Sequence, residues 1–221
     1  IDGKNAPRLT ISGNNASRVF QLEKNIKTTL SNLKIADGKV EGPGGGIFSR
    51  QGSTLTLINS KVENNTSEYG GGFFLGHLSK ATIINSEFTG NDGTLTTKKA
   101  GFSAGAISTE SRSELIIKGT DFRNNKGSNG GAIYAYSTVK FEIEDSLFEK
   151  NISKNLGNGG AISTDGINAF GPGDRSAGGT LLIRNSRFKD KQNKGRGGDL
   201  YLSGIGKEQP DSTASDFMGN G

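Results

Sequence analysis

The sequence predicts an all-β solenoid, a parallel β-helix, from three observations. Short apolar segments recur along most of the chain with a shortest period of 26 residues. Glycine clusters that end in an apolar residue alternate with these segments, and Ile47 and Phe73 each precede the next apolar anchor by 15 residues. No segment carries a sustained apolar stripe of helical period, and each of the 35 glycines would disfavour a helix by about 1 kcal/mol.

The elements are expected in the following order along the chain. Residues 1–34 depart from the repeat and are predicted to form an irregular N-terminal coil or cap. Residues 35–221 are predicted to form the β-helix, with about six to eight coils in all. Two insertions, near 92–100 and 164–178, lengthen single coils. Because residues 215–221 begin another repeat, we expect this chain to be part of a longer one or of a rod that another subunit continues.

Each predicted coil contains two kinds of apolar strand. Apolar residues two apart have strand periodicity; the pairs are Leu55 and Leu57, Leu115 and Ile117, Phe141 and Ile143, and Leu181 and Ile183. A single anchor follows in each coil, at Ile35, Val62, Phe88, Phe122, Phe148, Phe188 and Phe217. The Gly-Gly segment introduces a third short strand through a tight backbone that glycine adopts without strain.

Polar residues keep the same register as the anchors. Asn lies three residues after most anchors, at Asn65, Asn91, Asn125, Asn151 and Asn220. A hydroxyl residue lies two before, at Ser60, Ser86, Thr120, Ser146, Ser186 and Ser215. Stacked in consecutive coils, these side chains are expected to form an Asn ladder and a hydroxyl ladder that satisfy the turns above and below. A row of ligand-binding groups is the functional alternative.

Composition excludes several classes of site. The absence of cysteine excludes disulfides, a thiol nucleophile and Cys-ligated metal centres. A single histidine, His77, excludes a multi-His metal site, so we predict no metal and no cofactor. The net charge of +5 comes from basic residues interleaved with acidic ones, without the aromatic interleaving that stacks bases, so nucleic acid is not expected as a partner. No apolar run approaches the roughly 20 residues that span a bilayer.

The repeats resemble those of the polymorphic outer membrane protein family. Its GGA[I/L/V] element matches residues 130–133 and 159–162, and its FxxN element matches residues 88–91, 122–125, 148–151 and 217–220. The alternation covers roughly residues 35–221, with departures such as Asp199 in the third position of one glycine element. The resemblance implies a single-stranded, right-handed β-helix in an exported bacterial surface protein, extracellular and associated with the outer membrane, often with an adhesive role.

An outward row of aromatic residues is the predicted binding site. The position after each glycine-cluster residue should face outward, and it is aromatic at Phe48, Phe74, Tyr134 and Tyr201, with Tyr136 two residues further on the same face. Exposed rings stack on sugars or dock a protein. We therefore predict a passive structural or adhesive module for a surface glycan or protein partner. The alternative is that the two insertions cover this face.

Two other functions remain open. Many parallel β-helices are polysaccharide lyases, hydrolases or epimerases, and such an enzyme needs clustered carboxylates. The candidates are Asp165, Asp174, Asp190 and Asp199, although Asp in such loops more often forms turns. The third possibility is a self-assembling extracellular fibre, because coil ends are heterologous surfaces that do not close.

Overall fold

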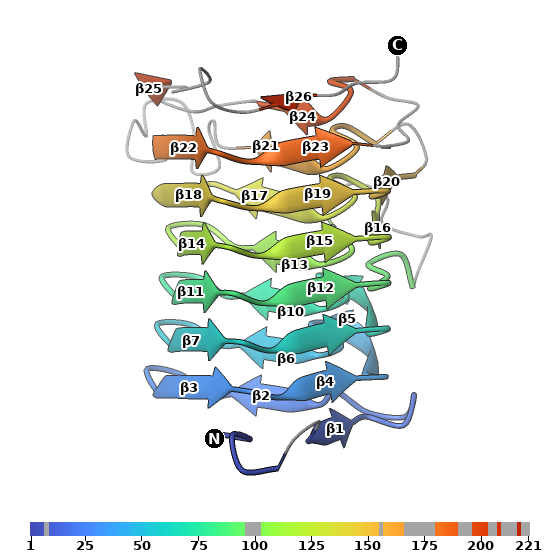
Figure 1. The fold of residues 1–221 in the computed structure, drawn as a ribbon, viewed down its shortest axis with the longest axis vertical. Helices are drawn as coiled ribbons and strands as arrows, with labels where there is room; N and C mark the ends of the chain where they lie inside the picture. Colours follow the sequence, from blue (N-terminus) through green and yellow to red (C-terminus); the bar gives the residue numbers. More distant parts are fainter. Residues whose placement is uncertain are drawn as a thin grey trace.

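The chain forms a stack of coils in which successive turns of the backbone lie directly above one another (Figure 1). The computed structural model describes residues 1–6, 9–95, 103–154, 157–165, 180–189 and 196–202, and the backbone of 207–208 and 216–217. These residues form 26 short strands and no helix. Seen in Figure 1, the chain runs from left to right along the front, returns behind and climbs toward the C-terminus, which makes the coil right-handed.

Three parallel sheets form the walls of the coil. Sheet A contains β3 (Lys27–Ser31), β7 (Thr54–Ile58), β11 (Lys80–Ile84), β14 (Glu114–Lys118), β18 (Lys140–Glu144), β22 (Thr180–Arg184) and β25 (Lys207–Glu208). Sheet B contains β1 (Thr10–Ser12), β4 (Lys34–Ala36), β8 (Lys61–Glu63), β12 (Glu87–Thr89), β15 (Asp121–Arg123), β19 (Leu147–Glu149), β23 (Arg187–Lys189) and β26 (Asp216–Phe217). Sheet C contains β2 (Phe20–Leu22), β6 (Ile47–Ser49), β10 (Phe73–Leu75), β13 (Ile107–Thr109), β17 (Ile133–Tyr136), β21 (Ile162–Asp165) and β24 (Leu200–Tyr201).

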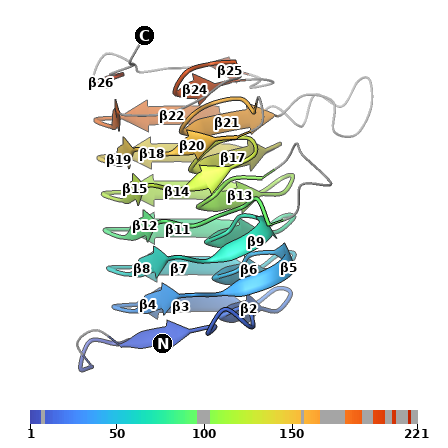
Figure 2. The ribbon, with the colours of Figure 1, turned by 90° about the vertical axis from the view of Figure 1, so that its right-hand side faces the viewer.

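Short strands add two smaller pairings between sheets B and C. They join β5 (Lys39–Pro43) to β9 (Thr66–Tyr69), and β16 (Lys126–Gly127) to β20 (Ile152–Ser153). Each coil therefore passes from sheet C to sheet A, then to sheet B, and through this corner back to sheet C (Figure 2). Parallel strands require such a crossover, and here the rest of the coil supplies it.

The observed registers follow the predicted repeat. Val62, Phe88, Phe122, Phe148 and Phe188 are direct neighbours on consecutive strands of sheet B. The insertion predicted near 92–100 falls between β12 and β13, whereas the one predicted near 164–178 overlaps the last two residues of β21. The strands β13 and β22 that follow them remain paired in register with the preceding coil. Regular pairing also extends into the 1–34 segment, because β2 and β3 pair in register with β6 and β7. The predicted all-β parallel β-helix is confirmed.

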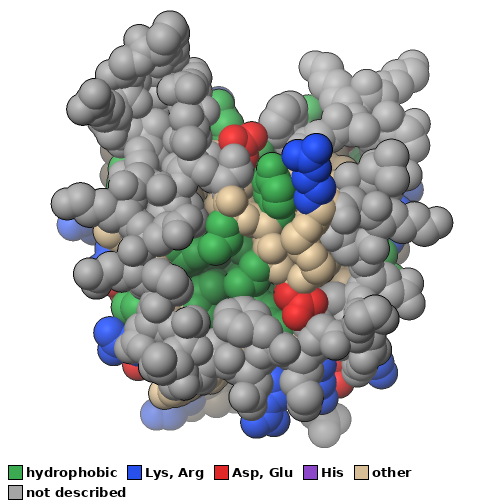
Figure 3. All heavy atoms as spheres, turned by 90° about the horizontal axis from the view of Figure 1, so that it is seen from above, with side chains coloured by type: hydrophobic (Ala, Val, Ile, Leu, Met, Phe, Trp, Pro, Cys, Tyr) green, Lys and Arg blue, Asp and Glu red, His purple; other side chains and the backbone are tan. Residues whose placement is uncertain are grey.

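Apolar side chains fill the inside of the coil. The rings of Phe88, Phe122, Phe148 and Phe188 stack face to face, with centroid separations of 5.2, 4.7 and 4.7 Å. All four rings are fully buried. Seen down the axis in Figure 3, hydrophobic side chains gather in the middle, with a few charged side chains beside them and others at the margin. Because each ring repeats at the strand spacing, the stack forms as a direct result of the register.

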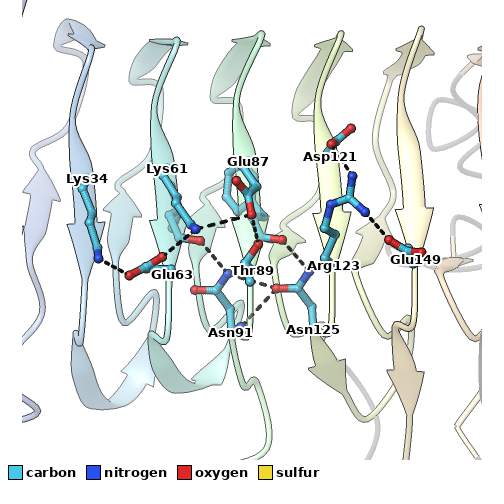
Figure 4. A network of polar contacts seen from close by, with 12 residues as sticks. Lys34, Lys61, Glu63, Glu87, Thr89, Asn91, Asp121, Arg123, Asn125 and Glu149 are labelled. Carbon is cyan, nitrogen blue, oxygen red and sulfur yellow. Dashed lines mark hydrogen bonds and ion pairs between the residues drawn. The ribbon is translucent and has the colours of Figure 1, made fainter. Parts of the chain in front are cut away.

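The predicted Asn ladder is present and buried. Asn65, Asn91 and Asn125 each donate from Nδ2 to Oδ1 of the next Asn, at 3.0 Å. The backbone N–H of each also donates to that oxygen at 3.1 Å, and the Nδ2 groups of Asn91 and Asn125 reach carbonyls of the preceding coil (Figure 4). This pattern supports the structural interpretation of these residues, because the amide groups are engaged within the ladder.

The predicted hydroxyl ladder occupies the turn between sheets A and B. The N–H groups of Ser60, Ser86 and Thr120 donate to the hydroxyl oxygen of the next member, at 3.2 to 3.4 Å. The residue before each hydroxyl has a left-handed backbone; these residues are Asn59, Asn85, Gly119, Asp145 and Asn185, with φ between 45 and 56°. Asn, Asp and Gly tolerate this conformation best, which explains their recurrence there.

The Asn ladder can be tested by one truncation. Asn125→Ala leaves the N–H and Nδ2 groups of Asn91 without their acceptor in a buried site, and we expect a loss of about 3–5 kcal/mol in the free energy of unfolding. Urea denaturation would measure this loss. The control is Thr82→Ala, on the outward face of β11, for which we expect a change within about 0.5 kcal/mol. Similar midpoints for the two variants would contradict a stabilising ladder.

Candidate functional site

The outward face of sheet C carries the predicted aromatic row. Parallel pairing aligns Phe48 with Phe74, Phe74 with Ser108, and Ser108 with Tyr134. The row continues through Ser163 to Tyr201. The side chains that follow these positions were predicted to face inward, and Ser49, Leu75, Thr109, Ala135 and Thr164 are indeed buried. Leu202 differs, with 41% of its surface exposed, because β24 ends at Tyr201 and no longer sets its direction.

The rings of the row differ in their exposure. Phe48, Phe74, Tyr136 and Tyr201 are half-buried, whereas Tyr134, which we expected to be exposed, retains only 2% of its surface. The reason is its neighbours: Tyr136 stacks on it at a centroid distance of 6.4 Å, and Asp165 lies next to its hydroxyl. Tyr134 therefore serves as a wall of the site rather than as a protruding contact.

Around part of this row the surface forms a groove of about 490 Å³. The described residues that line it are Pro43, Phe48, Tyr69, Phe74, Thr109, Glu110, Tyr134 and Tyr136. Four of the five predicted aromatic residues come together here, and Tyr201 lies two strands beyond Tyr134 in the row. We call this feature the aromatic groove.

Residues from outside the row complete the aromatic groove. Pro43 and Tyr69 face each other across the β5–β9 pair at the corner of the coil (Figure 2). The ring of Tyr69 meets Phe74 edge-on at 6.5 Å, and Phe48 meets Phe74 edge-on at 5.7 Å. Sequence analysis missed Pro43, Tyr69 and Glu110 because it followed one strand position per coil. The signal available for Tyr69 was its position directly before a glycine cluster.

Arg18 fixes the N-terminal wall of the aromatic groove. Its guanidinium lies over the ring of Phe48, 4.9 Å from the centroid. The same group donates to the carbonyl oxygen of Pro43 at 2.8 Å and to that of Gly44 at 2.9 Å. Burial is the main cause that lowers the pKa of Arg18 from its ordinary value, yet a guanidinium remains charged at physiological pH.

Two polar residues, Thr109 and Glu110, line the aromatic groove together with the rings. Glu110 is exposed, and its Oε2 accepts a hydrogen bond from the backbone N–H of His77 at 2.9 Å. Thr109 is 3% exposed, and its hydroxyl accepts from the N–H of Tyr136 at 3.1 Å. His77, predicted to be a solvated turn residue, is half-buried with its Nδ1 2.8 Å from the hydroxyl of Ser111. This arrangement ties the turn before β11 to the turn after β13.

Of the four acidic candidates for catalysis, the structure describes Asp165 and Asp199, and these two do not lie together. Asp165 is the last residue of β21. Asp199 directly precedes β24 and lies opposite Ala161, which directly precedes β21. These positions are four residues apart in register, which corresponds to about 13 Å along the strands. Asp174 and Asp190 lie outside the described residues. Asp165 instead accepts a 3.5 Å hydrogen bond from the Tyr134 hydroxyl.

A second hollow lies on the opposite side of the coil and is polar. It measures about 780 Å³ over the turns between sheets A and B and is lined by groups such as Asn32, Asn59 and Glu87. Several of its charged side chains form ion pairs: Lys61, for example, contacts Glu63 at 3.0 Å and Glu87 at 3.5 Å. Burial opposes ionisation of Glu63, but its lysine partners hold the pKa of its carboxyl below the ordinary value. These paired charges along sheet B (Figure 4) cross-link coils.

Comparison with known proteins identifies one family. The model of a family described as a right-handed beta helix region matches residues 2–196. No curated protein and no solved structure gives a significant match to the chain. Within the described part of the chain, no three His, Asp or Glu side chains form a group that could hold a metal ion. The described residues likewise include no helix with the length and hydropathy to cross a bilayer.

The environment of Tyr134 predicts an unusual titration. Burial and the negative charge of Asp165 raise the pKa of the Tyr134 phenol far above the ordinary value of 10.0. The folded state then keeps a proton that the unfolded state releases, so the free energy of unfolding should fall as the pH rises above 10.0. Phenolate absorbance should show one late-ionising tyrosine that Tyr134→Phe removes. If the late step persists in Tyr134→Phe, the assignment is wrong.

Proposed function

The chain belongs to the right-handed β-helix family, and we propose that it is a passive binding module that holds its ligand in the aromatic groove. The observation that carries this proposal is the gathering of five aromatic rings from three coils around one groove. Aromatic rings contribute a large apolar area and a defined geometry to an interface. The ligand would be an extended one, a surface glycan or a segment of a protein partner, because the groove crosses four strands of sheet C.

The construction of the groove suits binding more than bond cleavage. Its walls are rings and one proline, and Glu110 is the charged residue among the described lining residues. Acid–base cleavage of a polysaccharide needs a positioned pair of groups of suitable pKa, whereas Asp165 and Asp199 are about 13 Å apart along the strands. The enzyme alternative, a polysaccharide lyase, hydrolase or epimerase, is kept as an outcome of the test below.

Export to a bacterial surface is part of the proposal. Its support is the resemblance of the GGA[I/L/V] and FxxN elements to the repeats of polymorphic outer membrane proteins. A rod whose coils are joined by three sheets would hold the groove at a fixed distance from the cell, and several weak contacts along it would provide adhesion. Fractionation of cells that produce the full-length protein, with protease accessibility of residues 1–221 as the readout, tests this location.

Tyrosine fluorescence offers a direct test of the groove. The chain has four tyrosines and no tryptophan, and Tyr69, Tyr134 and Tyr136 line the groove. We expect a polymer from a panel of neutral and anionic polysaccharides, or a surface protein, to change this emission on binding. Phe74→Ala and Tyr136→Ala should each weaken binding by about tenfold or more, because central aromatic contacts are typical hot spots.

A matched control separates the groove from the rod. Ile116→Ala removes a half-buried apolar side chain from the outward face of sheet A, and we expect it to leave binding unchanged. Size-exclusion chromatography of each polymer after incubation, with and without Ca²⁺, follows its chain length. Shortening of a polymer would contradict the passive module, and binding that persists in both groove variants would place the site elsewhere.

A further inference from the structure

The rings of the aromatic groove are separated by a defined distance along the β-helix axis. Phe74 and Tyr134 occupy the same row of sheet C with Ser108 between them. Two strand spacings therefore separate these rings, which is about 9.5 Å. Ser108 is small and buried, and its hydroxyl accepts a 2.9 Å hydrogen bond from the N–H of Ala104. Ser108 is not among the lining residues, so Phe74 and the stacked pair of Tyr134 and Tyr136 are the successive aromatic contacts of the groove, with Glu110 beside them.

A polyproline II segment matches this spacing. Its left-handed helix has three residues per turn and rises about 3.1 Å per residue, or about 9.3 Å per turn. Laid along the β-helix axis, residues three apart in such a segment would contact Phe74 and the stacked pair of Tyr134 and Tyr136, in which Tyr136 has the accessible surface. From Phe48 to Tyr134 the groove covers three strand spacings, about 14 Å, the length of roughly five residues in this conformation. We infer that the aromatic groove binds a proline-rich polyproline II segment of a protein partner; this inference rests on the proposed function.

The hydrogen-bonding groups of the groove favour a proline-rich chain over a sugar. The polar side-chain groups of the described lining are three phenols, the Glu110 carboxylate and the Thr109 hydroxyl, which already accepts from Tyr136 N–H. A saccharide carries many hydroxyls, and hydroxyls buried without partners are costly. Proline has no N–H to satisfy and presents an apolar ring. Its exposed carbonyls can accept from phenols, as in other aromatic grooves that bind proline-rich segments.

Charge specifies one more feature of the ligand. Glu110 supplies the negative charge of the described lining, and its carboxylate accepts from the N–H of His77, which holds it at the groove. Asp165 adds a second carboxylate behind Tyr134. A basic residue next to the prolines at the Glu110 side, away from the Arg18 guanidinium over Phe48, would therefore be attracted electrostatically, an effect that weakens with added salt. The expected ligand is a proline-rich segment that carries Arg or Lys.

The walls of the groove are already held in place without a ligand. Arg18 stacks on Phe48 and bonds the carbonyl of Pro43. Phe48 and Tyr69 each contact Phe74 edge-on, and Tyr134 stacks on Tyr136. A polyproline II segment is also stiff before it binds. Binding between two preorganised surfaces loses less conformational entropy, so a short segment can give measurable affinity.

The decisive probe is an octaproline peptide with one arginine at each end. The two arginines allow one of them to reach Glu110 whichever way the peptide runs along the groove. Titration followed by tyrosine emission should show saturable binding. Phe74→Ala and Tyr136→Ala should weaken it by about tenfold or more, and Ile116→Ala should not. Tyr136→Phe, which keeps the ring, should retain most of the affinity, and circular dichroism of each variant establishes that it is folded.

Two matched changes test the ligand chemistry. Glu110→Gln should weaken the arginine-flanked peptide several-fold and reduce its salt dependence, while leaving uncharged octaproline unaffected. A flexible Gly-Ser peptide with the same two arginines should bind at least about tenfold more weakly than the proline peptide. Equal affinity of the two peptides would overturn the inference, because charge alone would then explain binding.

The outcomes separate this inference from the proposed function. If cellohexaose or a polymer of the panel binds in a Phe74-dependent manner and the proline peptide does not, the ligand class is wrong and the binding module stands. If the peptide binds equally well to the wild type and to both groove variants, the site is wrong. If no probe shows groove-dependent binding, both proposals fail.

Discussion

Parallel pairing of each coil with the next at a single strand spacing, about 4.8 Å, is the constraint on which the rest of this structure depends. Backbone hydrogen bonds alone would allow neighbouring coils to slip in register. The buried Asn ladder opposes slippage, because Asn91 and Asn125 reach both the preceding and the following coil. The stacked Phe rings need the same register. Slippage by one residue would therefore break buried amide contacts and ring stacking together.

Inward and outward positions of the coil differ in how residue types repeat from one coil to the next. Inside, residues of one kind recur at equivalent positions of successive coils: apolar anchors stack on apolar anchors, and Asn stacks on Asn. Outside, the residue type varies from coil to coil, and function depends on these differences. On sheet C the row of Phe48, Phe74, Ser108 and Tyr134 places two rings on neighbouring strands and the third two strands further on, a spacing that a uniform aromatic row would lack. On sheet B, alternating signs such as those of Arg123 and Glu149 join coils.

This division explains how far the sequence could predict the molecule. The anchors, the Asn ladder and the inward side chains such as Leu75 are periodic, so their register and burial followed from spacing alone. The alignment of the aromatic residues in one row could also be predicted. The complete lining of the groove could not, because Pro43 and Tyr69 come from the corner strands and Glu110 comes from a turn. The burial of Tyr134 depends on Tyr136 and on Asp165, which lies one coil further along, and a prediction that considers one position per coil does not include such diagonal contacts.

A site built in this way can change without loss of the fold. Stability resides mainly in the buried rings, amides and hydroxyls, whereas Phe48, Phe74 and Tyr136 are half-buried and contact few core groups. Substitution at an outward position alters the groove at one level and leaves the ladders above and below intact. The rod also limits what the groove can bind, because its contacts recur only at whole multiples of the strand spacing. A ligand whose repeat length differs from these multiples would contact one ring of the groove but not the next. The same register that stabilises the core therefore selects among extended ligands.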